Sequence, residues 1–266
     1  MPELEHETIR QAVLENYSAV AKREGGSGCG PATGCCGGGA DTASISKQIG
    51  YSEDELSSVP AGSDMGLGCG NPQAIAGLKP GETVLDLGSG GGFDCFLAAR
   101  QVGETGRVIG VDMTPDMIRK ARANARTANA SNVEFRLGEI EHLPVADRSV
   151  DVIISNCVIN LSPDKAAVFQ EAFRVLKPGG RLAIADIVAT APLPEEARSN
   201  LALISGCVGG AAPIEEIETY LREAGFRDIR THPKTALGEV LREWVPGSRA
   251  DEYVVSATIE AAKPHA

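Results

Sequence analysis

The chain has 266 residues, of which 42% are hydrophobic and 4% aromatic, and its formal net charge is −11. This hydrophobic fraction supports a packed core, and the length allows one α/β domain with additions or two small domains. The negative charge argues against binding to phosphate backbones or anionic membranes, and the shortage of aromatic rings argues against stacking surfaces for nucleic acid. We therefore expect a small-molecule substrate, with no nucleic-acid and no membrane partner.

The sequence has no run of about 18 apolar residues, which a membrane-spanning helix would need. The first residues are acidic (Glu3, Glu5 and Glu7) and do not resemble a signal peptide. These features predict a cytoplasmic protein, in a compartment that keeps thiols reduced. The cysteines number seven, which does not suggest a disulfide framework. They indicate thiol chemistry, soft-metal ligation or small buried residues.

In chain order, residues 4–21 carry apolar side chains at helical spacing and predict an amphipathic helix. Residues 25–39 are rich in glycine, which does not build a core, and they contain Cys29, Cys35 and Cys36. A linker is the simplest interpretation, although linkers rarely hold three cysteines. Residues 57–72 have the composition of a loop, in which Cys69 lies between two glycines. A cysteine in that setting is expected to be exposed or close to a ligand.

The stretch 82–94 combines a short apolar run with a glycine cluster and leads into a predicted helix. Strand, tight glycine turn and helix form the opening unit of a nucleotide-binding α/β domain. The dinucleotide fingerprint Gly-x-Gly-x-x-Gly would require a glycine where Phe93 stands. The spacing present instead is an acid followed by alternating glycines: Asp86, Gly88, Gly90 and Gly92.

Beyond this turn, predicted strands alternate with predicted helices. The strands cover residues 107–112, 132–137, 150–156 and 181–188, and the helices cover 114–128, 162–176, 195–207 and 213–224. The second strand ends in Asp112, about 20 residues after the glycine turn, where an acid typically accepts hydrogen bonds from ribose hydroxyls. Two last strands follow at 226–231 and 252–259. The pattern predicts an α/β fold with a doubly wound, mostly parallel seven-stranded sheet.

Over residues 79–188 these motifs resemble the class I S-adenosylmethionine (SAM) methyltransferases. The acid and the alternating glycines resemble motif I of that family, and residues 176–180 resemble the turn before its fifth strand. The resemblance implies a Rossmann-like fold, an antiparallel last strand and SAM as cofactor. Glu139 competes with its neighbour Glu141 for the adenine site. The cofactor-binding residues that the resemblance implies are Asp86, Gly88, Gly90, Gly92, Asp112, Met113, Ile140, Glu141 and Asn156.

The settings of Cys69, Cys157 and Cys207 closely resemble those in arsenite methyltransferases, in which three such cysteines bind trivalent arsenic beside the methyl group of SAM. The resemblance implies that these three residues are the catalytic and arsenic-binding groups, and that arsenite and methylarsenite are the substrates in arsenic detoxification. The chemistry is consistent, because arsenic(III) is soft and prefers thiolates. Its lone pair attacks a methyl group without a general base, so the protein contributes mainly positioning.

The resemblance also implies a redox role for an N-terminal cysteine, for which Cys35 and Cys36 are candidates together with Cys29. A thiol reductant, glutathione or thioredoxin, is then a co-substrate, and thioredoxin a partner. Cys95 is expected to be a small buried core residue. A zinc site is a poorer interpretation of Cys69, Cys157 and Cys207, because zinc ligands usually come as closely spaced Cys pairs and these three are far apart in the sequence.

Two other functions stay open at this point: a SAM methyltransferase for an organic acceptor of the quinone or sterol type, and a metalloid-binding protein without catalysis. We divide the chain into three parts. Residues 1–70 form an N-terminal helix and a Cys/Gly-rich arsenic-binding segment, and residues 71–211 form the SAM-binding core. Residues 212–266 complete the sheet and cap the substrate site.

Overall fold

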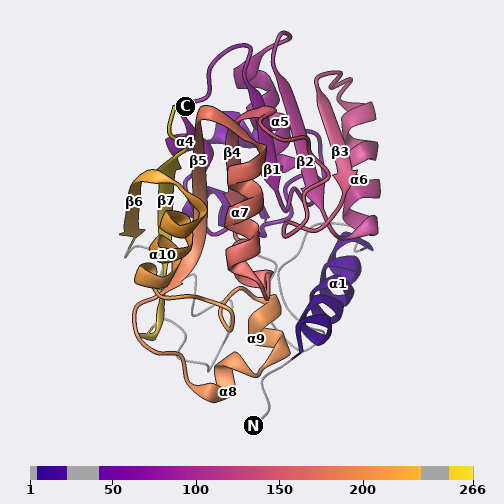
Figure 1. Ribbon diagram of the computed structural model, residues 1–266. Helices are drawn as coiled ribbons and strands as arrows, with labels where there is room; N and C mark the ends of the chain where they lie inside the picture. The colour runs from indigo at the N-terminus through magenta and orange to yellow at the C-terminus, as the bar shows by residue number, and fades with distance from the viewer. Residues whose placement is uncertain (1–4, 23–41, 235–251, 266) are drawn as a thin grey trace.

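The computed structural model describes residues 5–22, 42–234 and 252–265. A seven-stranded sheet with the order β3-β2-β1-β4-β5-β7-β6 forms its centre (Figure 1). The first five strands run parallel, and β7 pairs antiparallel with both β5 and β6. The predicted fold class is therefore confirmed, including the antiparallel last strand. The strands are β1 (Thr83–Leu87), β2 (Arg107–Asp112), β3 (Val133–Leu137), β4 (Val150–Asn156), β5 (Leu176–Ala189), β6 (Arg227–Lys234) and β7 (Val254–Ala262).

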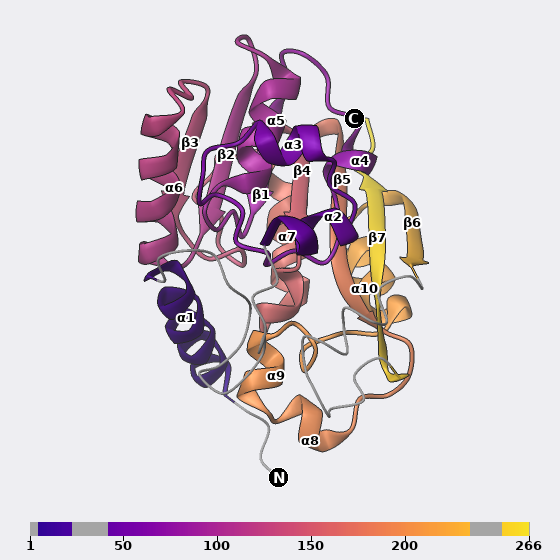
Figure 2. The ribbon, with the colours of Figure 1, turned by 180° about the vertical axis from the view of Figure 1, so that it is seen from behind.

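Helices cover both faces of the sheet, as the two opposite views show (Figures 1 and 2). One face carries α7 (Lys165–Val175) and α10 (Ile214–Ala224), and the other carries α4 (Gln73–Ala76) and α5 (Phe93–Val102). The helix α6 (Pro115–Thr127) packs on β2 and β3. Because the central strands are covered on both sides, their middles are mostly apolar: residues 152–154 of β4 are fully buried.

Three further helices lie beyond the carboxyl ends of the parallel strands. The helix α1 (His6–Lys22) packs against α6 and against α9 (Leu201–Ser205), which follows α8 (Glu195–Arg198). Both views place α1, α8 and α9 beyond this edge of the sheet (Figures 1 and 2). Three short elements complete the described fold: α2 (Thr42–Gln48), α3 (Glu53–Ser57) and the 3-10 helix η1 (Ile159–Leu161).

Several predicted boundaries shift by a few residues, and two differ most. The helix predicted over 195–207 is broken at Asn200, whose side chain accepts hydrogen bonds from the backbone N–H groups of Ala202 (2.9 Å) and Leu203 (3.3 Å). Asparagine caps a new helix better than it continues an old one, so α9 starts there and Cys207 falls in a turn beyond it. The strand β5 starts at Leu176 rather than at 181. Leu176 already pairs with Val150 of β4, and the predicted turn at 177–180 forms an irregularity within the strand.

Residues after 211 extend the sheet, since α10 covers one face and β6 and β7 form its edge. The described part of the chain thus forms one continuous sheet across the predicted boundary at 211–212, and the cap over the substrate site stays a prediction. Among the described residues, none of the helices combines the length and the apolar character that a membrane span requires.

Candidate active site

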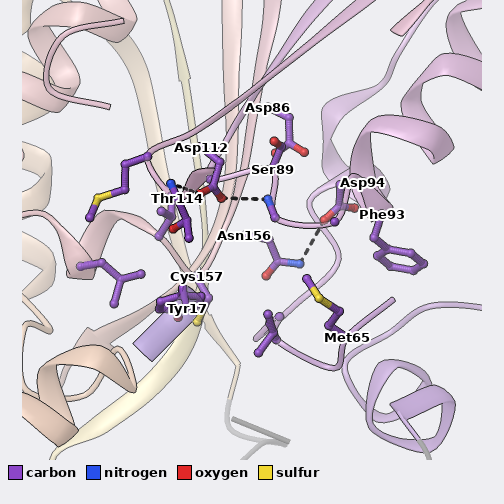
Figure 3. A pocket seen from close by; sticks show the side chains of 18 of the residues that line it. Tyr17, Met65, Asp86, Ser89, Phe93, Asp94, Asp112, Thr114, Asn156 and Cys157 are labelled. Atoms are coloured by element: carbon purple, nitrogen blue, oxygen red, sulfur yellow. Dashed lines mark hydrogen bonds between the residues drawn. The ribbon is translucent and has the colours of Figure 1, made fainter. Parts of the chain in front are cut away.

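A pocket open to solvent lies at the carboxyl ends of β1, β2 and β4 (Figure 3). The strand order reverses between β1 and β4, and loops diverge at such a point to leave a crevice. The glycine turn after β1, the end of β2 and the turn after β4 form its walls. The helix α1 closes it from the opposite side with Arg10, Val13 and Tyr17.

The glycine turn is shaped for close contact with a ligand. Gly88 (φ +69°) and Gly90 (φ +50°) adopt the left-handed conformation that side chains disfavour. The N–H of Gly90 donates to Oδ2 of Asp112 at 3.0 Å, and the N–H of Thr114 donates to Oδ1 at 2.8 Å. Burial raises the pKa of Asp112, and these backbone hydrogen bonds oppose that shift. Each carboxylate oxygen keeps a lone pair beyond these bonds, so Asp112 fits a ligand with hydroxyl donors.

Most predicted cofactor residues line this pocket. Glu141 accepts a hydrogen bond from the Ser162 hydroxyl at 2.6 Å and lies 3.7 Å from the Arg10 guanidinium. Its competitor Glu139 is not among the lining residues. Gly92 is not among them either: it is the N-cap residue before α5, and a side chain there would lie 2.7 Å from the Phe135 ring. The predicted residues on the pocket wall are Asp86, Gly88, Gly90, Asp112, Met113, Ile140, Glu141 and Asn156.

The three cysteines come together in a cluster at the wall of this pocket. Cys157 lines it, and Cys69 and Cys207 pack with Cys157 in one buried apolar cluster. The Cys207 thiol donates to the carbonyl oxygen of Cys157 at 3.0 Å, and the Cys157 thiol interacts with both other thiols. All three side chains are at least 96% buried, since their exposed fractions are 0%, 4% and 4%. Ile187, Leu193 and Val208 belong to the same cluster.

Two of these cysteines have an unusual backbone. Cys157 (φ +57°) follows β4 and Cys207 (φ +64°) follows α9, and both lie in the left-handed region. Non-glycine residues rarely adopt this conformation, and those that do often mark functional sites. The turns direct both side chains back toward the carboxyl edge of the sheet. The sequence motif around each cysteine is therefore a turn rather than part of a helix or strand.

Burial keeps the three thiols protonated at neutral pH. It raises the pKa of Cys69 to about 11 and raises that of Cys157 well above its usual range. For Cys207 the hydrogen bond with Cys157 is the largest cause of a similar rise, and burial is the second. Such thiols are poor nucleophiles toward general electrophiles. They suit a ligand whose central atom exchanges a bound hydroxide for a thiol sulfur, because the hydroxide accepts the thiol proton in the same step.

An acid that the sequence analysis missed stands beside the thiols. One carboxylate oxygen of Asp186 on β5 and the sulfurs of Cys69 and Cys157 all lie within 4.8 Å of one another. The carboxylate accepts hydrogen bonds from the N–H of Ile159 (2.9 Å) and from Asn160 Nδ2 (3.0 Å). Burial raises its pKa to about 6. A usable signal existed: β5 pairs in parallel with β4, so an acid near its end falls next to Cys157.

The cysteines outside this cluster were also considered in the sequence analysis. Cys95 is fully buried in α5, and its thiol donates to Oδ2 of Asp86 at 3.2 Å. Cys29, Cys35 and Cys36 lie outside the described residues. Sequence analysis also missed Tyr17, whose hydroxyl donates to the carbonyl oxygen of Ser205 at 3.4 Å and interacts with the Cys207 thiol. Tyr17 and Cys157 both line the pocket, and both are labelled in Figure 3.

Comparison with known proteins first defines the class. Residues 78–225 match the methyltransferase domain family. The crystal structure of the arsenic(III) S-adenosylmethionine methyltransferase of Chlamydomonas reinhardtii superposes with a TM-score of 0.63 at 36% sequence identity, covering 83% of this chain and 73% of that one. The chain is thus a class I methyltransferase.

Two curated relatives narrow this class. An arsenite methyltransferase of Halobacterium salinarum is 52% identical over 97% of this chain and 67% of its own length. The human arsenite methyltransferase is 43% identical over 54% of this chain. The chain belongs to the arsenite methyltransferase family. It spans about two thirds of the Halobacterium protein, and the matched region covers 40% of the human one. Membership in this SAM-dependent family implies SAM as the methyl donor.

Proposed function

We propose that the protein transfers the methyl group of SAM to trivalent arsenic, supplied as arsenite, which Cys69, Cys157 and Cys207 hold together, or as methylarsenite, which two of these thiols hold. One observation carries this proposal: three cysteines far apart in the sequence converge in one buried cluster at the wall of the donor pocket. Relatives that cover much of the chain bear the name arsenite methyltransferase. Thiols are the ligands that a soft atom such as arsenic(III) prefers.

Capture of arsenite by this cluster is a balanced exchange. Each step forms one arsenic–sulfur bond and breaks one arsenic–oxygen bond, and the thiol proton leaves with the hydroxyl group as water. Three exchanges give a neutral arsenic trithiolate. A neutral complex suits an apolar cavity, whereas three unliganded thiolates would be costly to bury there. The raised pKa values of the free thiols agree with this reaction, because no separate deprotonation precedes it.

The pocket residues determine where the donor lies. Asp112 presents carboxylate oxygens to hydroxyl groups of the donor. The glycine turn next to Asp112 has no side chains that would keep the donor away from its backbone. When bound, SAM would supply a methyl group on a positively charged sulfur. The arsenic lone pair would bond to the methyl carbon, and the carbon–sulfur bond would break to leave S-adenosylhomocysteine. Cys157 lines the same pocket and thereby directs the arsenic toward the donor. The contribution of the chain is mainly orientation and exclusion of water.

Methylation raises the formal oxidation state of arsenic from +3 to +5, so a two-electron reductant must restore it for further rounds. We assign this role to a dithiol or glutathione-type reductant, such as thioredoxin, with Cys35 and Cys36 as the candidate exchange partners on this chain. A reducing compartment such as the cytoplasm supplies that chemistry.

Substitution of the central cysteine tests the proposal. We expect Cys157→Ser to lose at least about a hundredfold in the rate of arsenite methylation, because one of three ligands to the arsenic is gone. The matched control is Cys95→Ser, which changes a buried thiol outside the cluster and should retain activity. Rates come from chromatography of arsenic species, with SAM affinity measured by calorimetry. Full activity of Cys157→Ser with intact SAM binding would contradict the three-thiol site.

A further inference from the structure

Cys69 stands on a loop between two short helices, yet its thiol is fully buried beside Cys157. Both polar groups of its peptide backbone have side-chain partners. The N–H of Cys69 donates to Oδ1 of Asn156 at 3.0 Å, and its carbonyl oxygen accepts a hydrogen bond from the Ser256 hydroxyl at 2.8 Å. The two partners come from β4 and β7, so the loop is held from two strands of the sheet.

The Asn156 amide is held in the orientation that this contact needs. Its Nδ2 donates to the carbonyl oxygen of Gly70 at 2.8 Å and to the Tyr51 hydroxyl at 2.9 Å. The Tyr51 hydroxyl in turn donates to Asp94 at 2.8 Å. With both amide hydrogens engaged, Oδ1 is left for the N–H of Cys69. Figure 3 shows Asn156 pointing toward Asp94, across from Asp112 and the glycine turn.

The glycines on either side of Cys69 allow the loop to lie against these strands. A side chain at Gly68 would come within 2.6 Å of Nδ2 of Asn156, and one at Gly70 within 2.7 Å of the Ala185 side chain. Neither space admits even a methyl group without displacement. The motif Gly68-Cys69-Gly70 is thereby explained by close approach to β4 and β5, which brings the Cys69 thiol within 3.5 Å of the Ala185 carbonyl oxygen.

We propose that Asn156 and Ser256 are positioning residues that hold the Cys69 peptide and so bring the third thiol to the arsenic. This inference rests on the function proposed above. It gives Asn156 a role beyond the predicted contact with the cofactor, and it assigns a role at the site to the last strand. Ser256 is 1% exposed, so loss of its hydroxyl leaves the carbonyl of Cys69 buried without this donor.

The chain offers a matched pair of serines for a test. Ser155 on β4 is also buried, but its hydroxyl has no hydrogen-bond partner among the described residues. Ser256→Ala and Ser155→Ala therefore remove the same atom, and only the first removes a bond to Cys69. We expect Ser256→Ala to weaken arsenite binding about tenfold, the effect of one buried hydrogen bond. Ser155→Ala should bind arsenite like the wild-type protein, and SAM affinity should be unchanged in both.

Calorimetry gives both affinities, and X-ray absorption at the arsenic edge counts the sulfur neighbours. The wild-type protein and Ser155→Ala should show three sulfurs, and the reference variant Cys69→Ser should show two. In Ser256→Ala the average should fall below three, which general loss of stability would not produce. Wild-type affinity with three sulfurs in Ser256→Ala overturns this inference alone. If the wild-type protein itself does not bind arsenite through three sulfurs, the proposed function fails first.

Discussion

At the scale of the residue, the site depends on thiols that burial keeps in the neutral form. The three cysteines lie in an apolar cluster whose walls include Ile187, Leu193 and Val208. A low dielectric disfavours the thiolate and so raises the thiol pKa. The proximity of Asp186 and of Cys207 raises the pKa of Cys69 further, whereas the hydrogen bond with Cys157 lowers it. A thiol in these surroundings is protected against oxidation and alkylation, yet free to exchange with arsenite.

The pH dependence of alkylation measures this protection. With a pKa of about 11, the thiolate fraction of Cys69 should rise about tenfold per pH unit from pH 7 to pH 10. Its reaction with iodoacetamide should rise accordingly, without a plateau in that range. An exposed thiol levels off near its usual pKa of about 8.5. Peptide mapping by mass spectrometry separates Cys69 from the other cysteines, and a plateau for Cys69 below pH 9 would refute the raised pKa.

At the scale of the element, two short turns deliver Cys157 and Cys207, and these turns are packed against each other. A side chain at Gly210 would lie 2.1 Å from the carbonyl oxygen of Asn160, which belongs to the 3-10 helix after Cys157. Asn160 also donates to Asp186 and to the carbonyl oxygen of Ile187 (2.6 Å). Backbone contact between the two turns thus fixes the separation of their cysteines.

Gly210→Ala should disrupt this contact. Because the obstructing atom is a backbone oxygen, the turn must shift, at an expected cost of about 1–3 kcal/mol in unfolding free energy. Arsenite affinity should fall, while SAM affinity is retained. The control is Gly206→Ala, next to Cys207, where the nearest atom would lie at 3.4 Å. Thermal unfolding and calorimetry check both variants, and equal arsenite affinity in the two would argue against the packed turns.

The same scale shows why sequence predicts some site residues and misses others. The glycine turn and Asp112 follow from local patterns, because strand, turn and acid are neighbours in the sequence. Asp186 and Ser256 reach the site through strand pairing, and the antiparallel register of Ser256 with Ile187 is a tertiary property. Gly92 matches the motif, and its lack of a side chain accommodates the rings of Phe135 and Phe96, so its predicted contact with the cofactor stays a prediction.

At the scale of the whole molecule, four segments far apart in the chain meet at one edge of the sheet. The helix α1 supplies Tyr17, the loop before β1 supplies Cys69, and the turns after β4 and α9 supply the other two thiols. The predicted fold class, including its antiparallel last strand, is confirmed. It could be predicted because alternating strands and helices allow few topologies. The convergence of the three cysteines was expected only from the family resemblance, since loop conformation has no periodic signal.

The most direct measurement of the central claim is a single turnover with the purified wild-type chain. The protein is loaded with one equivalent of arsenite and one of SAM, in the presence of a dithiol, and the products are quantified together. The account predicts methylated arsenic and S-adenosylhomocysteine in equal amounts, and no methyl transfer to quinone or sterol acceptors offered in place of arsenite. Bound arsenite that remains unmethylated, or transfer to an organic acceptor alone, would contradict it.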